Sequence, residues 1–154
     1  MLCSRKPMAL GLITLALYAM PGSAEPLSLR SGSYRVTVRL ELLHLENVNT
    51  ETVTQICLSS AAGSNNYGIA VLSSNNPLAN CHISNVYEDA VQLAFDIFCE
   101  GKNTARAKAH YEVGPDEFNG RIVMQMGGKN MTMTEVQIGH RVGACDSAKA
   151  SRRN

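Results

Sequence analysis

Sulfur-bearing side chains are the residues of this chain best suited to chemistry. Five cysteines stand at positions 3, 57, 81, 99 and 145. No two of them form the Cys-x-x-Cys spacing of thiol oxidoreductases, in which one thiol lowers the pKa of the other and makes it reactive. The pattern is instead typical of structural disulfides, so we expect the cysteines to stabilise the fold rather than to catalyse a reaction.

Methionine is concentrated in one segment, residues 124–133, which reads Met-Gln-Met-Gly-Gly-Lys-Asn-Met-Thr-Met. In a hairpin whose turn centres on the Gly-Lys pair, Met126 faces Met131 and Met124 faces Met133, so four thioethers lie on one face. Soft thioethers suit Cu(I), and copper or silver handling is therefore one hypothesis. The alternative is that these side chains fill core gaps or line an adaptable apolar groove.

Histidines and carboxylates do not form a recognisable catalytic pattern. The four histidines match no zinc-binding spacing, and Asp96 and Glu135 fall on predicted strands without an evident partner. No Gly-x-Ser-x-Gly elbow occurs, and Gly127-Gly128 lies in a predicted hairpin rather than before a helix, which excludes a phosphate-binding loop. We therefore expect a protein that is not an enzyme and has no cofactor.

The first 24 residues have the features of an export signal. Two basic residues precede an apolar run from Met8 to Met20, and Pro-Gly-Ser-Ala then provides small residues for cleavage after Ala24. This run is shorter than the about 20 residues needed to cross a bilayer, and no later segment is apolar enough to do so. We expect a soluble mature protein without a membrane span, in the bacterial periplasm or secreted.

Charge argues against nucleic acid as a partner. Removing the two basic residues of the signal from the 14 in the chain leaves 12, against 13 acidic residues, for a net charge of about −1. Nucleic-acid binders instead show a basic stripe or patch. Only residues 147–154 are locally basic, and we expect them to form a flexible, solvated tail.

Alternation of apolar and polar residues predicts seven β-strands. They are expected at residues 33–46, 52–58, the two arms of an 81–99 hairpin, 104–113, 118–126 and 131–142. A short helical turn within 67–72 is the only helix expected. Residues 25–146 should form a single all-β domain with minor α content, an antiparallel meander whose sheet curls strongly or closes into a small barrel.

Two disulfides are expected in the oxidising compartment to which the signal directs the chain. If the 81–99 hairpin centres on residue 90, Cys81 lies opposite Cys99, close enough to be bridged. Cys57 then pairs with Cys145. The rival connectivity joins Cys57 to Cys81 and Cys99 to Cys145.

The inner face of such a curled sheet is the first candidate for a binding site. Curved sheets commonly hold a small apolar ligand at their mouth. Its expected lining is Val38, Leu40, Phe95, Ile122, Met124 and Met133, of which we single out the last four as ligand-binding residues. We expect a non-enzymatic periplasmic binding or envelope-interaction module, for a small apolar ligand or an envelope protein. The alternative is that these residues merely fill the core.

The cysteine-bearing segments resemble a known family. They are, in order, Thr54-Gln-Ile-Cys-Leu58, Asn80-Cys-His-Ile-Ser84, Phe98-Cys-Glu-Gly101 and Ile138-Gly-His-Arg-Val-Gly-Ala-Cys145. With the methionine-rich hairpin, they resemble exported bacterial proteins catalogued as domain of unknown function 3617. The chain departs from the expected pattern at His140, where Arg or another polar residue is expected, and in its Ser- and Asn-rich segment 59–66. The resemblance implies a periplasmic β-rich domain and assigns no catalytic residue.

Overall fold

The computed structural model describes residues 27–42, 50–59, 69–100, 104–126 and 131–145. The predicted export signal at 1–24 and the predicted basic tail at 147–154 lie outside these residues, and both stay predictions.

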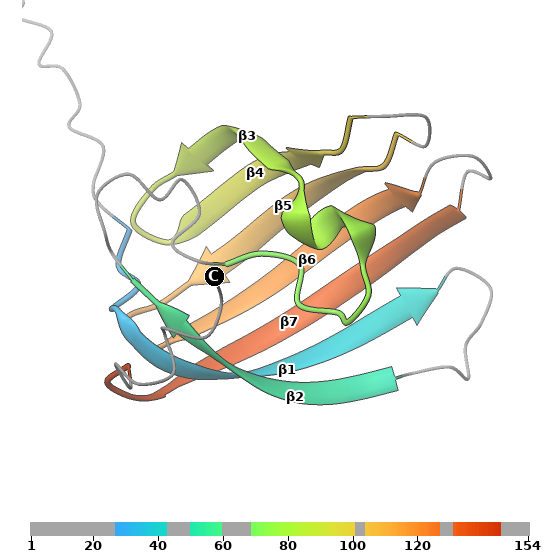
Figure 1. Ribbon diagram of the computed structural model, residues 1–154. Coiled ribbons are helices and arrows are strands. Elements are labelled where there is room, and N and C mark those ends of the chain that lie inside the picture. The colour runs from blue at the N-terminus through green and yellow to red at the C-terminus, as the bar shows by residue number, and fades with distance from the viewer. Residues whose placement is uncertain (1–26, 43–49, 60–68, 101–103, 127–130, 146–154) are drawn as a thin grey trace, which may run out of the picture.

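Seven strands form one antiparallel sheet in the order β2-β1-β7-β6-β5-β4-β3 (Figure 1). The strands are β1 (Gly32–Leu42), β2 (Thr50–Leu58), β3 (His82–Glu88), β4 (Gln92–Phe98), β5 (Arg106–Val113), β6 (Glu117–Met126) and β7 (Met131–Gly143). Strands β3 to β7 form a meander, and the β1–β2 hairpin adds to it by pairing β1 with β7. The predicted all-β class and antiparallel sheet are confirmed.

The sheet is curled and open, because β2 and β3 are its two edges and do not pair with each other. The small barrel, which was one of the two predicted forms, is therefore not formed. Residues 69–81, which we call the strap, run across the inner face of the sheet before β3 begins (Figure 1). The chain thus covers the inner face with its own strap rather than by closing the sheet.

One 3-10 turn, η1 (Pro77–Asn80), is the only helix within the described residues. The side chain of Asn76 accepts a hydrogen bond from Leu78 N at 3.0 Å, and Pro77 occupies the first turn, where its missing N–H is not needed. The helical turn predicted within 67–72 is not present in residues 69–72. It forms instead where a cap and a proline favour it.

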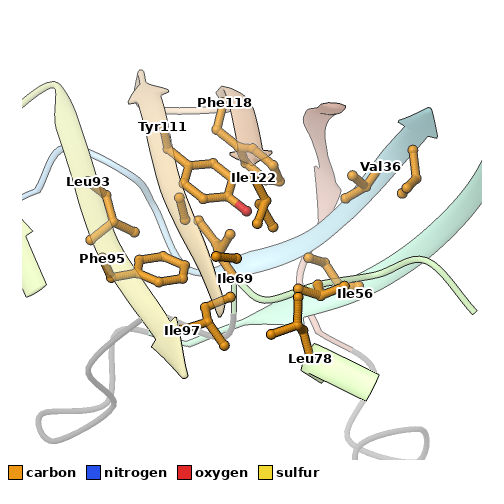
Figure 2. Packing of buried hydrophobic residues seen from close by; sticks show 14 of the residues in the cluster. Val36, Ile56, Ile69, Leu78, Leu93, Phe95, Ile97, Tyr111, Phe118 and Ile122 are labelled. Atoms are coloured by element: carbon orange, nitrogen blue, oxygen red, sulfur yellow. The ribbon is translucent and has the colours of Figure 1, made fainter. Parts of the chain in front are cut away.

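The core lies between the inner face of the sheet and the strap. Alternate residues of the strands point inward, as in β5, whose described inner face consists of Ala107, Ala109, Tyr111 and Val113. Ile69 and Leu78 of the strap have exposed fractions of 0% and 1%, and Figure 2 shows them among the labelled side chains of the sheet. Small alanines on β5 leave room for a covering segment to approach the sheet.

A row of aromatic rings crosses the inner face. Ring centroids are 5.8 Å apart for Tyr34 and Phe118, 5.9 Å for Phe118 and Tyr111, and 5.9 Å for Tyr111 and Phe95. These separations are in the range of favourable aromatic pairs. The row joins strands β1, β6, β5 and β4 into a single packed layer.

Two inward-facing glycines make room for this row. Gly120 pairs with Tyr111 across β5 and β6, and Gly139 pairs with Phe118 across β6 and β7. A Cβ atom on Gly139 would lie 2.2 Å from Phe118 Cε1, and one on Gly120 would lie 2.0 Å from Tyr111 Cε1. Each ring therefore lies flat over the strand beside it, in space that only glycine leaves free.

Two disulfides join Cys57 to Cys145 and Cys81 to Cys99. Their Cα–Cα distances are 5.5 Å and 5.0 Å, respectively. The favoured connectivity is confirmed and the rival is excluded. One bond fastens edge strand β2 to the end of β7, and the other closes the β3–β4 hairpin at the point where the strap ends.

Candidate functional site

A buried polar network anchors the strap to β7. The Glu135 side chain is 0% exposed, and its carboxylate accepts hydrogen bonds from Leu72 N at 2.7 Å and Ser73 N at 3.1 Å. The side-chain amide of Gln137 donates a third, at 2.6 Å. The sequence left Glu135 without a partner, whereas in the structure its carboxylate binds two successive backbone N–H groups of the strap.

Gln137 extends this network to both sides. Its amide nitrogen also donates to Ala70 O at 2.8 Å, and its amide oxygen accepts from the Tyr111 hydroxyl at 3.2 Å. Burial, and secondarily the charge of Glu135, raise the pKa of Tyr111 well above its usual value, so its hydroxyl remains a donor. The network satisfies buried polar groups and is closed to solvent, which is the geometry of a structural anchor.

The four residues predicted to bind a ligand on the inner face lie beneath the strap. Phe95 is 2% exposed, Ile122 and Met124 are 0% exposed, and Met133 is partly buried against the core. Val38 and Leu40, the other predicted lining residues, are buried and partly buried on the same face. In the described structure these side chains pack a core, which is the alternative given above. A ligand role for them stays a prediction.

The predicted methionine register is confirmed. Met124 pairs with Met133 and Met126 with Met131, so all four side chains belong to the inner face of β6 and β7. Met124 is 0% exposed, and its sulfur accepts a hydrogen bond from Asn76 Nδ2 at 3.1 Å. Met131 is 51% exposed at the opposite end of the set. The predicted turn at 127–130 lies outside the described residues.

The described residues contain no cluster of three or more His, Cys, Asp or Glu side chains able to hold a metal ion. A metal role for Met124, Met126, Met131 and Met133 would therefore depend on thioethers alone, and it remains a prediction.

A groove of about 630 Å³ lies on the opposite, outer face of the sheet, and we call it the outer groove. It is lined by Ser84, Asn85, Asp96, Ile97, Phe98, Arg106, Ala107, Lys108, Val123 and Gln125, from strands β3 to β6. Its volume falls within the range of small-molecule sites. Alternation alone did not predict this groove, although Phe98 and Val123 interrupt otherwise polar strand faces and were a usable signal.

A β-bulge shapes one end of the outer groove. The β3–β4 register shifts between Ser84 and Tyr87, and Asn85 has a φ of 51°. Bulges re-aim side chains, and the side-chain amide of Asn85 donates to Asp96 Oδ2 at 2.8 Å. The other oxygen of Asp96 lies 3.8 Å from Lys108 Nζ. The carboxylate of the groove is thus engaged from both sides.

The centre of the outer groove combines charge with exposed apolar surface. Arg106 Nε donates to Gln125 Oε1 at 2.6 Å, which fixes the plane of the guanidinium. Phe98 and Val123 are 43% and 44% exposed. Phe98 pairs across the strands with Arg106, and Val123 with Lys108, so each cation stands beside an apolar side chain.

Together these features define an all-β domain with an open sheet, two disulfides, an inner face sealed by its own strap and a mixed polar and apolar groove on its outer face. A family model described as "Protein of unknown function (DUF3617)" matches residues 29–145, and the chain belongs to this family. Comparisons with curated proteins and with solved structures gave no significant match.

The disulfides bear on where the protein resides. Its disulfides are compatible with an extracytoplasmic location, where such bonds form and persist. Among the residues that the structure describes, no helix has the length and apolar character needed to cross a membrane.

Proposed function

We propose that this protein is a non-enzymatic binding module of the bacterial envelope, acting in the periplasm after export. Its ligand occupies the outer groove rather than the inner face. The observation that carries this proposal is the groove itself: a hollow of about 630 Å³ in which exposed apolar side chains lie beside hydrogen-bonding and charged groups. The inner face, by contrast, is filled by the strap.

The chemistry of the groove favours binding over catalysis. Asp96 is the one carboxylate of its lining, and Asn85 and Lys108 both engage it. A carboxylate that acts as a general base must turn a free oxygen toward the proton it abstracts, whereas both oxygens of Asp96 face groups of the protein. Glu135 and Tyr111, the buried titratable groups of the network, face the strap and have no path to a substrate in the groove.

The dimensions of the groove favour a small molecule over an envelope protein. Stable protein interfaces bury about 800 Å² on each partner, whereas the groove is a local hollow between four strands. Phe98 and Val123 supply its exposed apolar surface. A small ligand with an apolar part fits this lining.

Native mass spectrometry of the mature protein purified from periplasm tests the proposal. We expect a bound mass that is lost on denaturation. Val123→Glu places a charge in the groove and should abolish that mass, while Val53→Glu, at a 62% exposed valine of edge strand β2, should retain it. A bound mass that survives Val123→Glu would refute the groove as the site. A wild-type protein that shows no added mass in native spectra would refute tight binding of a ligand.

A second candidate function is copper or silver handling by the methionine face. The observation in its favour is the register, which places Met126 opposite Met131 and Met124 opposite Met133 on one face. Thioethers are ligands for Cu(I). We expect one Ag(I) per chain in native spectra, lost in a Met126→Leu, Met131→Leu double variant and retained in Val123→Glu. Equal silver binding by the double variant would refute this candidate.

A further inference from the structure

We infer that the outer groove selects a small amphipathic anion, meaning a carboxylate or phosphate monoester attached to an apolar group. This inference rests on the proposed function and specifies its ligand class. It follows from the position of two cations among exposed apolar side chains.

Arg106 is the anchor for the anionic group. Its Nε donates to Gln125 Oε1 at 2.6 Å, which orients the planar guanidinium across the groove. Its two terminal amino groups have no partner among the described residues. A guanidinium held in this way presents a pair of parallel N–H donors, which match the oxygens of a carboxylate or phosphate in a bidentate contact.

Lys108 adds a second positive charge on the same face. It follows Arg106 by two residues on β5, which places it about 7 Å further along the strand. Its side chain is 87% exposed, and its nearest carboxylate oxygen, from Asp96, is 3.8 Å away. The lining therefore carries two cations against one carboxylate. That surplus favours an anion and disfavours a cation.

Apolar surface lies beside both cations. Phe98 is the cross-strand neighbour of Arg106 and Val123 that of Lys108, with exposed fractions of 43% and 44%. An inorganic anion would leave these side chains in water. An anion with an attached apolar group covers them and gains the hydrophobic contribution of that burial. This arrangement distinguishes an amphipathic anion from free phosphate or sulfate.

The bulge on β3 sets the direction in which such a ligand lies. Asn85 holds Asp96, the one carboxylate of the lining, at the β3 end of the groove. An anionic head at Arg106 is repelled from it. The apolar part of the ligand then extends over Val123, on the β6 side.

Protein-observed NMR titration of the mature protein tests this inference with four probes of one shape: 4-phenylbutyrate, 4-phenylbutyl phosphate, 4-phenylbutanol and 4-phenylbutylamine. We expect the two anions to shift groove resonances, including the Arg106 Nε–H, and the alcohol and amine to bind at least tenfold more weakly. Arg106→Gln should weaken anion binding at least tenfold. Arg35→Gln, at an exposed arginine on β1 outside the groove, should change it less than twofold.

The outcomes separate this inference from the proposed function. Binding of the alcohol or amine as tight as that of the anions, or anion binding unchanged in Arg106→Gln, overturns the anionic class while the groove remains a binding site. Absence of groove shifts with all four probes overturns both. A preference for the carboxylate or for the phosphate supports the inference and identifies which head group the groove takes.

Discussion

Replacing Glu135 by Gln should destabilise the protein by about 2–4 kcal/mol, although it removes a buried charge. The carboxylate accepts three hydrogen bonds, from Leu72 N, Ser73 N and the amide of Gln137. Each bond to a charged group contributes about 1.5–3 kcal/mol. A glutamine has one acceptor oxygen, so its amino group would face at least one of these donors.

Desolvation acts in the opposite direction. Burying a carboxylate costs several kcal/mol, and that cost is reduced in the neutral variant. We expect the lost hydrogen bonds to dominate, because the donors are fixed backbone N–H groups of the strap that no other described side chain reaches. A loss of this size is a large part of the about 5–15 kcal/mol typical of a domain.

Urea unfolding of the oxidised protein, followed by circular dichroism, measures this difference. Glu112→Gln is the matched control, since Glu112 lies on the exposed face of β5, and it should change stability by less than about 0.5 kcal/mol. Hydrogen exchange at Leu72 and Ser73 should accelerate more than exchange in β6. A cost below about 1 kcal/mol for Glu135→Gln, or a gain in stability, would refute the argument.

Three further predictions concern the scaffold. Gly139→Ala should lower the free energy of unfolding in urea by about 1–3 kcal/mol, because the added Cβ would lie 2.2 Å from a ring carbon of Phe118. Gly114→Ala is the control and should be nearly neutral, since the nearest atom to its added Cβ is at 3.5 Å. Equal losses in the two variants would contradict this prediction. Replacing both cysteines of the Cys57–Cys145 disulfide, which spans 88 residues, by serine should lower the free energy of unfolding by about 4–5 kcal/mol. A loss under about 1 kcal/mol, measured by thermal or urea unfolding, would exclude a large loop-entropy effect. The hydrogen bond from Arg121 lowers the pKa of Glu41 below its usual 4.5, so ionised Glu41 stabilises the fold above that pH, and this stabilisation is lost as pH falls through the lowered pKa. Glu41→Gln should therefore flatten the acid side of a curve of stability against pH. An unchanged curve would contradict this prediction.

Local pattern was sufficient to predict much of the scaffold. The strands alternate between buried and exposed residues, and in β5 this alternation is complete. Hairpin register follows from where the turn is placed, and both the Cys81–Cys99 disulfide and the Met124–Met133 pair were predicted in this way. These features depend on residues close in sequence, so little knowledge of the rest of the fold is needed.

The candidate sites depended on contacts that alternation does not encode. The inner-face residues were predicted as buried-face positions, but alternation does not say whether a ligand or the chain itself covers that face. The Glu135 carboxylate accepts a hydrogen bond from the backbone N–H of Leu72, which lies 63 residues earlier in the sequence. The outer groove brings together side chains from four strands, and one end of it is shaped by a bulge in which Asn85 has a positive φ.

The sequence by itself thus determined the strand content, the sheet type and the family of this protein and favoured one of two disulfide connectivities, because period, turn chemistry and cysteine spacing are local signals. Only the tertiary structure decided that the sheet stays open, that the strap fills its inner face, and that an accessible hollow lies on the outer face of the described residues. The physical reason is that the path of the strap is set by burial of Ile69 and Leu78 and by the Glu135 anchor. Those interactions exist only once distant strands have assembled.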